Sequence, residues 1–195
     1  MMQNIDDITK YLKENLSEIR FAHIMGVAET AKSLAKRWGA DEHKAFLAGL
    51  VHDCAKEIPV DESVKRLKNY GYIPDSLKSR SPALLHAPLG AYIAAELFGI
   101  TDREVLDAVR YHTTGRENMT LLEKIVYVAD FTEPGRKYRE SVEVREISKN
   151  DIDAAVLAEA DAVIKFTIDK GRPVHTDTII ARNSMLFKRG KTDES

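Results

Sequence analysis

The chain has 195 residues, of which 44% are hydrophobic and 31% charged, values typical of one ordinary domain that buries a single core. Its 29 basic and 31 acidic residues give a net charge of −2, which excludes a whole-molecule field that would draw the chain onto nucleic acid or acidic lipid. We therefore predict a single domain over residues 1–195, in which any bound anion meets a local basic patch.

The expected location is the cytoplasm. The single Cys54 cannot form an internal disulfide, and the N-terminal segment is too polar to provide the apolar core of a signal peptide. No segment approaches the roughly 18 to 20 apolar residues that a membrane helix needs. We expect neither a membrane partner nor a nucleic-acid polymer.

Apolar residues recur mostly at three- and four-residue intervals, a pattern that favours helices over strands along almost the whole chain. We therefore predict an all-α fold of eight or nine helices and no sheet. In chain order, the predicted helices cover roughly residues 17–38, 41–53, 61–70, 83–98, 102–112, 121–131, 151–170 and 176–187. The segments between them that are rich in Gly, Pro and charge, including EPGRKYRES, are predicted loops.

Three of these helices carry polar residues where a buried side chain is expected. His23 lies beside the apolar stripe of the first predicted helix. The segment AFLAGLVHDCAKE places His52 and Asp53 at what should be the buried end of an apolar helix, and Asp130 ends the apolar run IVYVAD. Because burying such groups without a strong partner is costly, a divalent cation is the partner that satisfies them best.

Together, His23, His52, Asp53 and Asp130 offer two imidazoles and two carboxylates. Such a mixed nitrogen and oxygen set suits iron, manganese, nickel, cobalt or zinc, and it lacks the thiolates of a structural zinc site. Each residue alone is more often structural, and spacing along the chain does not show that the four converge. If they do, ligands from separate helices form a site inside a helical bundle.

The ordered set of these four residues resembles the H…HD…D signature of the HD superfamily of helical metal-dependent phosphohydrolases. HDCAK is similar to the HDxxK form of that signature, with Lys56 as the lysine. Over nearly its whole length the chain more narrowly resembles the YqeK-like HD proteins, bacterial symmetrical diadenosine tetraphosphate hydrolases. The matching stretches are RFAHIMGVAETA, LAGLVHDCAKE, LLHAPLGAYIA, VRYHTTG, KIVYVADFTEPGR and VHTDTIIARN.

The resemblance implies an HD-domain helical bundle in which His23, His52, Asp53 and Asp130 bind an iron-type centre. It also implies that the substrate is split into two nucleoside diphosphates, so that the nucleotide partners are a dinucleoside polyphosphate and its ADP product. A metal ion lowers the pKa of bound water and shields phosphoryl oxygens, which supplies both nucleophile and electrostatic stabilisation. As a hypothesis, Asp53 orients that water as well as binding the metal.

The resemblance places two further histidines, His86 and His112, at the active site. They are expected to contact the phosphates, to donate a proton to the leaving diphosphate, or to complete a second metal position bridged by Asp53. One metal or two is left open. Together with Asp53 and Lys56, these histidines form the predicted catalytic set.

Predicted substrate binding involves His86, His112 and three further residues. Arg136 and Arg139 follow the ligand Asp130 in a basic loop, and Arg side chains match phosphate oxygens in bidentate geometry. Gly26, one helical turn beyond His23, offers a place where a ribose or base can approach the backbone.

Two alternative functions remain open at this point. A nucleoside or deoxynucleoside phosphohydrolase acting on mono- or triphosphates would use the same centre, whereas a nucleotide-binding regulator would keep the pocket without turnover. The sequence also leaves open the physiological metal, the base preference and the general acid. A homodimer is the expected assembly, because helical domains of this kind often pair through apolar helix faces.

Overall fold

The computed structural model describes residues 4–193 and, over that range, contains ten α-helices, one 3-10 turn and no strand. The elements in chain order are α1 (Ile5–Asn15), α2 (Glu18–Trp38), α3 (Glu42–Val51), α4 (Val60–Asn69), η1 (Lys78–Arg80), α5 (Pro82–Glu96), α6 (Arg103–Tyr111), α7 (Leu121–Thr132), α8 (Arg139–Ser148), α9 (Ile152–Asp169) and α10 (Thr176–Asp193). The predicted all-α fold is confirmed, although eight or nine helices was too low a number.

Two helices were not predicted. Helix α1 begins after Asn4, whose side chain accepts a hydrogen bond from the Asp7 amide, and it buries Ile8 and Leu12, one turn apart. Helix α8 begins inside the segment EPGRKYRES, which was predicted to be a loop, and it has Val144 on its buried face. Both helices are short and highly charged, so their narrow apolar stripes are weak signals in the sequence.

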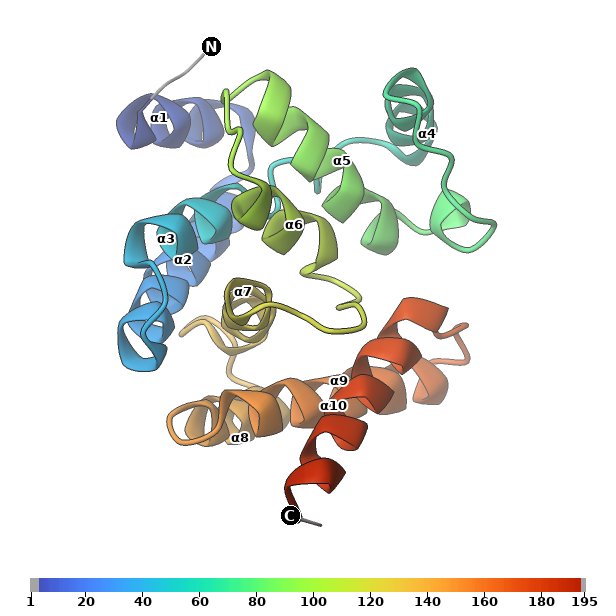
Figure 1. Cartoon of the computed structure of the whole chain (residues 1–195). Coiled ribbons are helices and arrows are strands. Elements are labelled where there is room, and N and C mark those ends of the chain that lie inside the picture. The colour runs from blue at the N-terminus through green and yellow to red at the C-terminus, as the bar shows by residue number, and fades with distance from the viewer. Residues whose placement is uncertain (1–3, 194–195) are drawn as a thin grey trace.

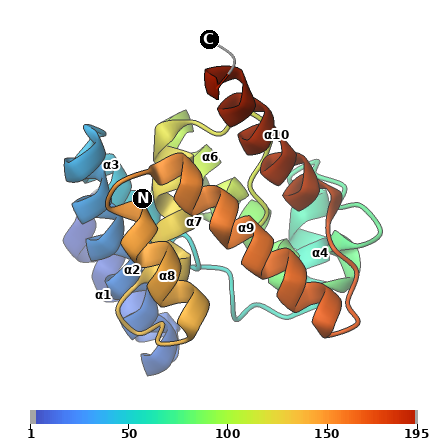
Figure 2. The ribbon, with the colours of Figure 1, turned by 90° about the horizontal axis from the view of Figure 1, so that it is seen from below.

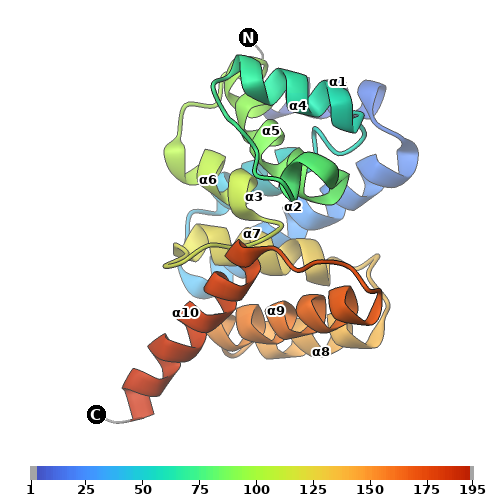
Figure 3. The same cartoon turned by 90° about the vertical axis from the view of Figure 1, so that its right-hand side faces the viewer.

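Helix α7 lies at the centre of the bundle, where it is seen nearly end-on in Figure 1. It packs against α2, α3 and α6 on one side and against α8 and α9 on the other. Helix α9 packs against α8, and α10 lies beside α9 (Figure 2). In the third view, α10 extends beyond the rest of the bundle towards the C-terminus (Figure 3). Within residues 4–193, no helix is long and apolar enough to cross a membrane.

The close packing of α2 against α3 brings two predicted metal ligands, His23 and His52, close to each other. A Cβ atom added at Gly49 would lie 2.8 Å from the Ala28 Cα atom, so only glycine allows the two backbones to approach this closely. His23 lies on α2 and His52 directly follows α3, both within about one turn of this contact. The packing therefore places both imidazoles against the central helix α7, which carries Asp130.

Candidate metal centre

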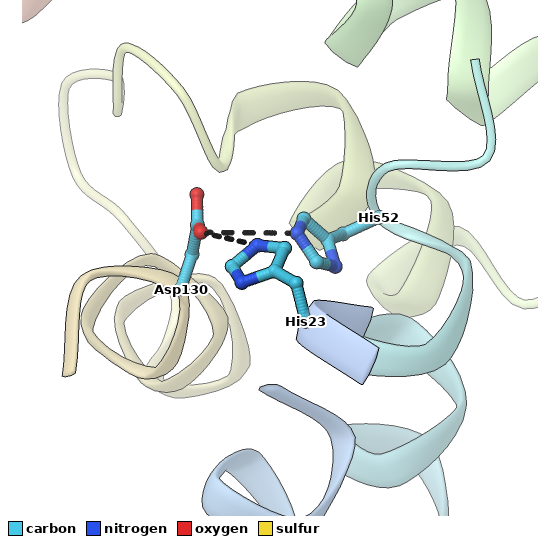
Figure 4. A group of neighbouring side chains, drawn as sticks. All are labelled: His23, His52 and Asp130. Carbon is cyan, nitrogen blue, oxygen red and sulfur yellow. Dashed lines mark ion pairs between the residues drawn. The ribbon is translucent and has the colours of Figure 1, made fainter. Parts of the chain in front are cut away.

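Three of the four predicted ligands converge from three helices (Figure 4). The Nε2 atom of His23 lies 3.0 Å from Asp130 Oδ1, and His52 Nε2 lies 3.9 Å from the same oxygen. One ligand atom from each residue lies within 4.8 Å of the others. The sequence could not establish this convergence, and the structure brings the three side chains together.

Asp53 completes the group from the chain position next to His52. Its Oδ2 atom lies 3.6 Å from His52 Nε2 and 3.8 Å from His23 Nε2, while its Oδ1 atom faces His86 and His112. The side chain is almost fully buried. Because its two oxygens face different histidines, Asp53 lies between the His23 side and the His86 side of the centre.

Three histidines of the site are oriented by the same kind of contact, in which ring Nδ1 faces a backbone carbonyl oxygen. The Nδ1 atom of His52 lies 2.6 Å from the Gly49 carbonyl oxygen, that of His112 lies 2.7 Å from Val109 O, and that of His86 lies 3.2 Å from Pro82 O. Because a carbonyl oxygen only accepts, each Nδ1 must carry the hydrogen and donate it. A ring held in this way, when neutral, directs the lone pair of its Nε2 atom into the centre, which is the form that binds a metal.

On the His86 side of the centre, several nitrogen and oxygen atoms that carry lone pairs lie close together. His86 Nε2 lies 2.9 Å from His112 Nε2 and 3.0 Å from Asp53 Oδ1. Lys56 Nζ lies 3.1 Å from the same His86 nitrogen and 3.6 Å from Asp53 Oδ1. Lone pairs that face one another at such distances repel unless a proton or a cation lies between them. Lys56 supplies one such positive charge.

The protonation states of these groups match those of metal ligands. Burial lowers the pKa of both His52 and His86 to about 4, so both rings are neutral at pH 7. Burial opposes the ionisation of Asp53 and Asp130, but the neighbouring imidazoles hold the pKa of each carboxyl below its usual range. Neutral imidazoles and ionised carboxylates are the forms that coordinate a cation.

Three ligand atoms of the centre, namely His23 Nε2, His52 Nε2 and Asp53 Oδ1, are buried and have no hydrogen-bond partner within the described part of the chain. Buried polar atoms are nearly always hydrogen-bonded, and leaving one unpartnered costs roughly 1–3 kcal/mol. The Nε2 atoms of His23 and His52, with Asp130 Oδ1 beside them, fit a bound cation, and Asp53 Oδ1 lies next to this group on the side of His86 and His112. Nitrogen and oxygen donors in the absence of thiolates suit a transition metal of the iron to zinc series.

Three residues of the site were missed from the sequence. Arg20, one turn before His23, donates to Asp53 Oδ2 at 2.5 Å, and Glu133, one turn after Asp130, lies 3.2 Å from His23 Nδ1. Their three-residue spacing from a ligand on a helical segment was the available signal.

The third missed residue, Thr113, directly follows a predicted site histidine. Its hydroxyl oxygen lies 3.3 Å from His86 Nε2 and 3.2 Å from His112 Nε2. Its position next to His112 in VRYHTTG was the only signal in the sequence. The hydroxyl therefore contacts the same two nitrogens that face Asp53.

The structure places the predicted substrate-binding residues Arg136, Arg139 and Gly26 differently. Arg136 lies at the edge of the centre, with Nη2 3.4 Å from Asp130 Oδ1. Arg139 is 83% exposed and pairs with Glu143, so the structure does not bring its side chain to the centre. A Cβ atom at Gly26 would lie 2.8 Å from a carboxylate oxygen of Glu133, so this glycine makes room for the carboxylate that contacts His23.

Comparisons with known proteins agree with this fold. The HD domain family model matches residues 20–135, a range that holds all four predicted ligands. A Bacillus subtilis protein named symmetrical bis(5'-nucleosyl)-tetraphosphatase is 40% identical over 94% of this chain and 98% of its own length. A Staphylococcus aureus protein of the same name is 35% identical over 92% of this chain and 93% of its own.

A crystal structure from Clostridium acetobutylicum, described as a predicted HD superfamily hydrolase involved in NAD metabolism, has a TM-score of 0.93 and 44% identity. It covers 96% of this chain and 100% of its own. The chain therefore belongs to the HD domain family. Within that family, it belongs to the group whose curated members are named symmetrical bis(5'-nucleosyl)-tetraphosphatase.

Proposed function

We propose that this protein is a metal-dependent symmetrical bis(5'-nucleosyl)-tetraphosphatase that hydrolyses diadenosine tetraphosphate to two molecules of ADP. The observation that carries the proposal is the convergence of His23, His52 and Asp130, with Asp53 beside them, in a chain that such enzymes match along more than nine tenths of its length. The dinucleoside tetraphosphate is the substrate class that the names of these relatives indicate.

His23, His52, Asp53 and Asp130 are the proposed metal ligands, and iron is the proposed metal, with manganese, cobalt, nickel or zinc as substitutes. When bound, the ion activates water and shields the charge of the phosphoryl oxygens. Arg20 holds the Asp53 carboxylate through an ion pair, and Glu133 fixes the ring of His23 through Nδ1. Partners of this kind keep metal ligands oriented.

Lys56, His86 and His112 form the proposed catalytic group on the other side of Asp53. Because burial lowers the pKa of His86 to about 4, this ring accepts the Lys56 hydrogen bond at neutral pH rather than supplying a proton. Lys56 therefore provides the positive charge that meets the leaving diphosphate. A second metal near His86 and His112 is part of the proposal, because ligand atoms of His52, Asp53 and His112 lie within 4.8 Å of one another and His86 Nε2 lies 2.9 Å from His112 Nε2. To bind it, His86 Nε2 would exchange its contact with Lys56 for the metal.

Arg136 is the proposed phosphate-binding residue at the Asp130 side. Its guanidinium is 38% exposed beside an ionised carboxylate, so it can turn towards a phosphate without leaving the edge of the centre. Gly26 acts through the space that it leaves for Glu133. Arg139 stays a prediction for substrate binding, and it requires release from Glu143.

The deciding experiment is chromatographic product analysis. Protein loaded with iron, manganese or cobalt is incubated with diadenosine tetraphosphate and, separately, with a panel of mono- and triphosphates. We expect ADP as the only product, no turnover after metal chelation, and a loss of orders of magnitude in Asp53→Ala. Cleavage of mononucleotides alone would support the general nucleotide phosphohydrolase, and binding without any cleavage would support the regulator.

Location and assembly belong to the same proposal. A cytoplasmic enzyme matches the lack of a membrane-spanning helix within residues 4–193. A homodimer is proposed through the outer faces of α9 and α10, where Phe166, Ile168 and Phe187 are 57%, 62% and 74% exposed. Sedimentation velocity is expected to give the mass of a dimer, and a monomer at all concentrations would contradict this part.

A further inference from the structure

A pocket of about 320 Å³ adjoins the metal centre on the His86 side. This volume is at the lower end of the range for small-molecule sites. Residues from α5, the end of α6, the segment after it, the turn η1 and the start of α10 surround it, among them Leu84, Arg110, Tyr111, Thr113, Lys78 and Asp177. Helices α5 and α6 lie side by side in Figure 1, and the cavity between their ends is called the Arg110 pocket below.

Thr113 joins the Arg110 pocket to the metal centre. It lines the pocket, and its hydroxyl lies 3.3 Å from His86 Nε2 and 3.2 Å from His112 Nε2. These are the same nitrogens that face Asp53 Oδ1. A phosphate chain bound at the centre therefore has the Arg110 pocket as its neighbour, one residue away from the catalytic histidines.

Three cationic side chains line the pocket, and they differ in whether a carboxylate already pairs with them. Arg116 donates two hydrogen bonds to Glu123, at 3.1 and 2.5 Å, and Lys78 pairs with Asp177 at 2.9 Å. Arg110 forms no ion pair with any side chain that the structure describes. Of these three side chains, Arg110 is therefore the one whose positive charge is available to bind an anionic ligand.

Arg110 is also held in place. Its guanidinium carbon lies 5.1 Å from the ring centroid of Tyr92, and that ring stacks on Tyr70 at 4.6 Å. The Nε atom of Arg110 is buried and has no hydrogen-bond partner among the described residues. A buried donor without an acceptor, on a fixed guanidinium beside a phosphohydrolase centre, is suited to a phosphate oxygen.

We propose that the Arg110 pocket binds the nucleoside diphosphate half of the substrate that leaves, with Arg110 donating hydrogen bonds to its phosphate oxygens. The inference rests on the proposed function, because only a dinucleoside polyphosphate has a second phosphorylated half. A mononucleotide held at the metal centre leaves this pocket unused. Arg110 is thus the residue that favours dinucleoside tetraphosphates over mononucleotides.

The first test compares Arg110→Gln with Arg103→Gln, which removes the same charge from the exposed start of the same helix. Loss of a charged hydrogen bond is expected to lower kcat/KM for diadenosine tetraphosphate about ten- to a hundred-fold in Arg110→Gln, chiefly through KM. Arg103→Gln is expected to match the wild type. Equal kinetic constants for the two variants would overturn the inference.

The second test does not depend on turnover. Inorganic pyrophosphate is titrated calorimetrically into metal-loaded protein, and its affinity is expected to fall at least about ten-fold in Arg110→Gln but not in Arg103→Gln. If diadenosine tetraphosphate is not hydrolysed by the wild type while pyrophosphate affinity still depends on Arg110, the proposed function fails and the phosphate site stands. Affinity that is independent of Arg110 overturns the site.

A second variant covers the case in which Arg110→Gln does not fold, as judged by circular dichroism. Leu84→Trp fills the pocket from another wall and keeps the guanidinium and its contact with Tyr92. We expect the same loss of affinity for diadenosine tetraphosphate in this variant. Wild-type KM values in folded Leu84→Trp would overturn the inference.

Discussion

Replacing Glu159 by Gln is expected to stabilise the protein at pH 7 more than at pH 5. Glu159 lies on α9 with 4% of its surface exposed, and its Oε2 atom has no hydrogen-bond partner in the portion of the chain that the structure describes. Burial raises the pKa of this carboxyl well above its usual range, the charge of Asp130 raises it further, and Arg136 offsets only part of the effect. The folded protein therefore holds Glu159 in its neutral form.

The sign of the effect follows from linkage. In the unfolded chain Glu159 ionises near its ordinary pKa of 4.5, whereas the folded chain keeps the proton to higher pH. The stability that this carboxyl contributes is fully present below pH 4.5 and declines as the pH rises towards the folded pKa. The loss is about 1.4 kcal/mol for each pH unit in that window, and glutamine, which does not ionise, avoids it.

The assay is urea unfolding of wild type and Glu159→Gln at pH 5 and pH 7, in the same metal state. The stability gain of the variant should grow by up to about 2.7 kcal/mol between these pH values. Glu14→Gln, at an exposed position on α1, should show a much smaller change. A difference between Glu159→Gln and wild type that stays constant from pH 5 to pH 7 would refute the reasoning, because it would mean that Glu159 is already ionised in the folded state.

Two further predictions concern the site and the central helix. Gly26→Ala places a methyl group 2.8 Å from a Glu133 oxygen, which displaces this carboxylate from His23, so metal affinity should fall about ten-fold or more in a chelator competition assay. Unchanged affinity would separate Glu133 from metal binding. Thr120→Ala removes the capping box that Thr120 forms with Glu123 at the start of α7, and urea unfolding should show a loss of about 1 kcal/mol. A loss below a few tenths of a kcal/mol would contradict that role.

The sequence determined the helical class and the residues that could bind a metal, because both are local properties. The three- and four-residue apolar periods predicted the core of α2, and Gly39, which adopts a φ of 73°, ends that helix where expected. His52 and Asp53 stood out because an apolar segment carried them into its buried end. Helices α1 and α8 escaped prediction because few apolar residues mark their buried faces.

The tertiary structure alone decided which atoms meet, because contacts between distant segments depend on how whole helices pack. It brought Asp130 of α7 to His23 of α2, and it separated Arg136 at the centre from Arg139, which is three residues away and faces solvent. Among the side chains that the structure describes, it also left Arg110 without a counter-ion beside the site. Ion pairing and burial of this kind arise from segments far apart in the chain, and no local pattern encodes them.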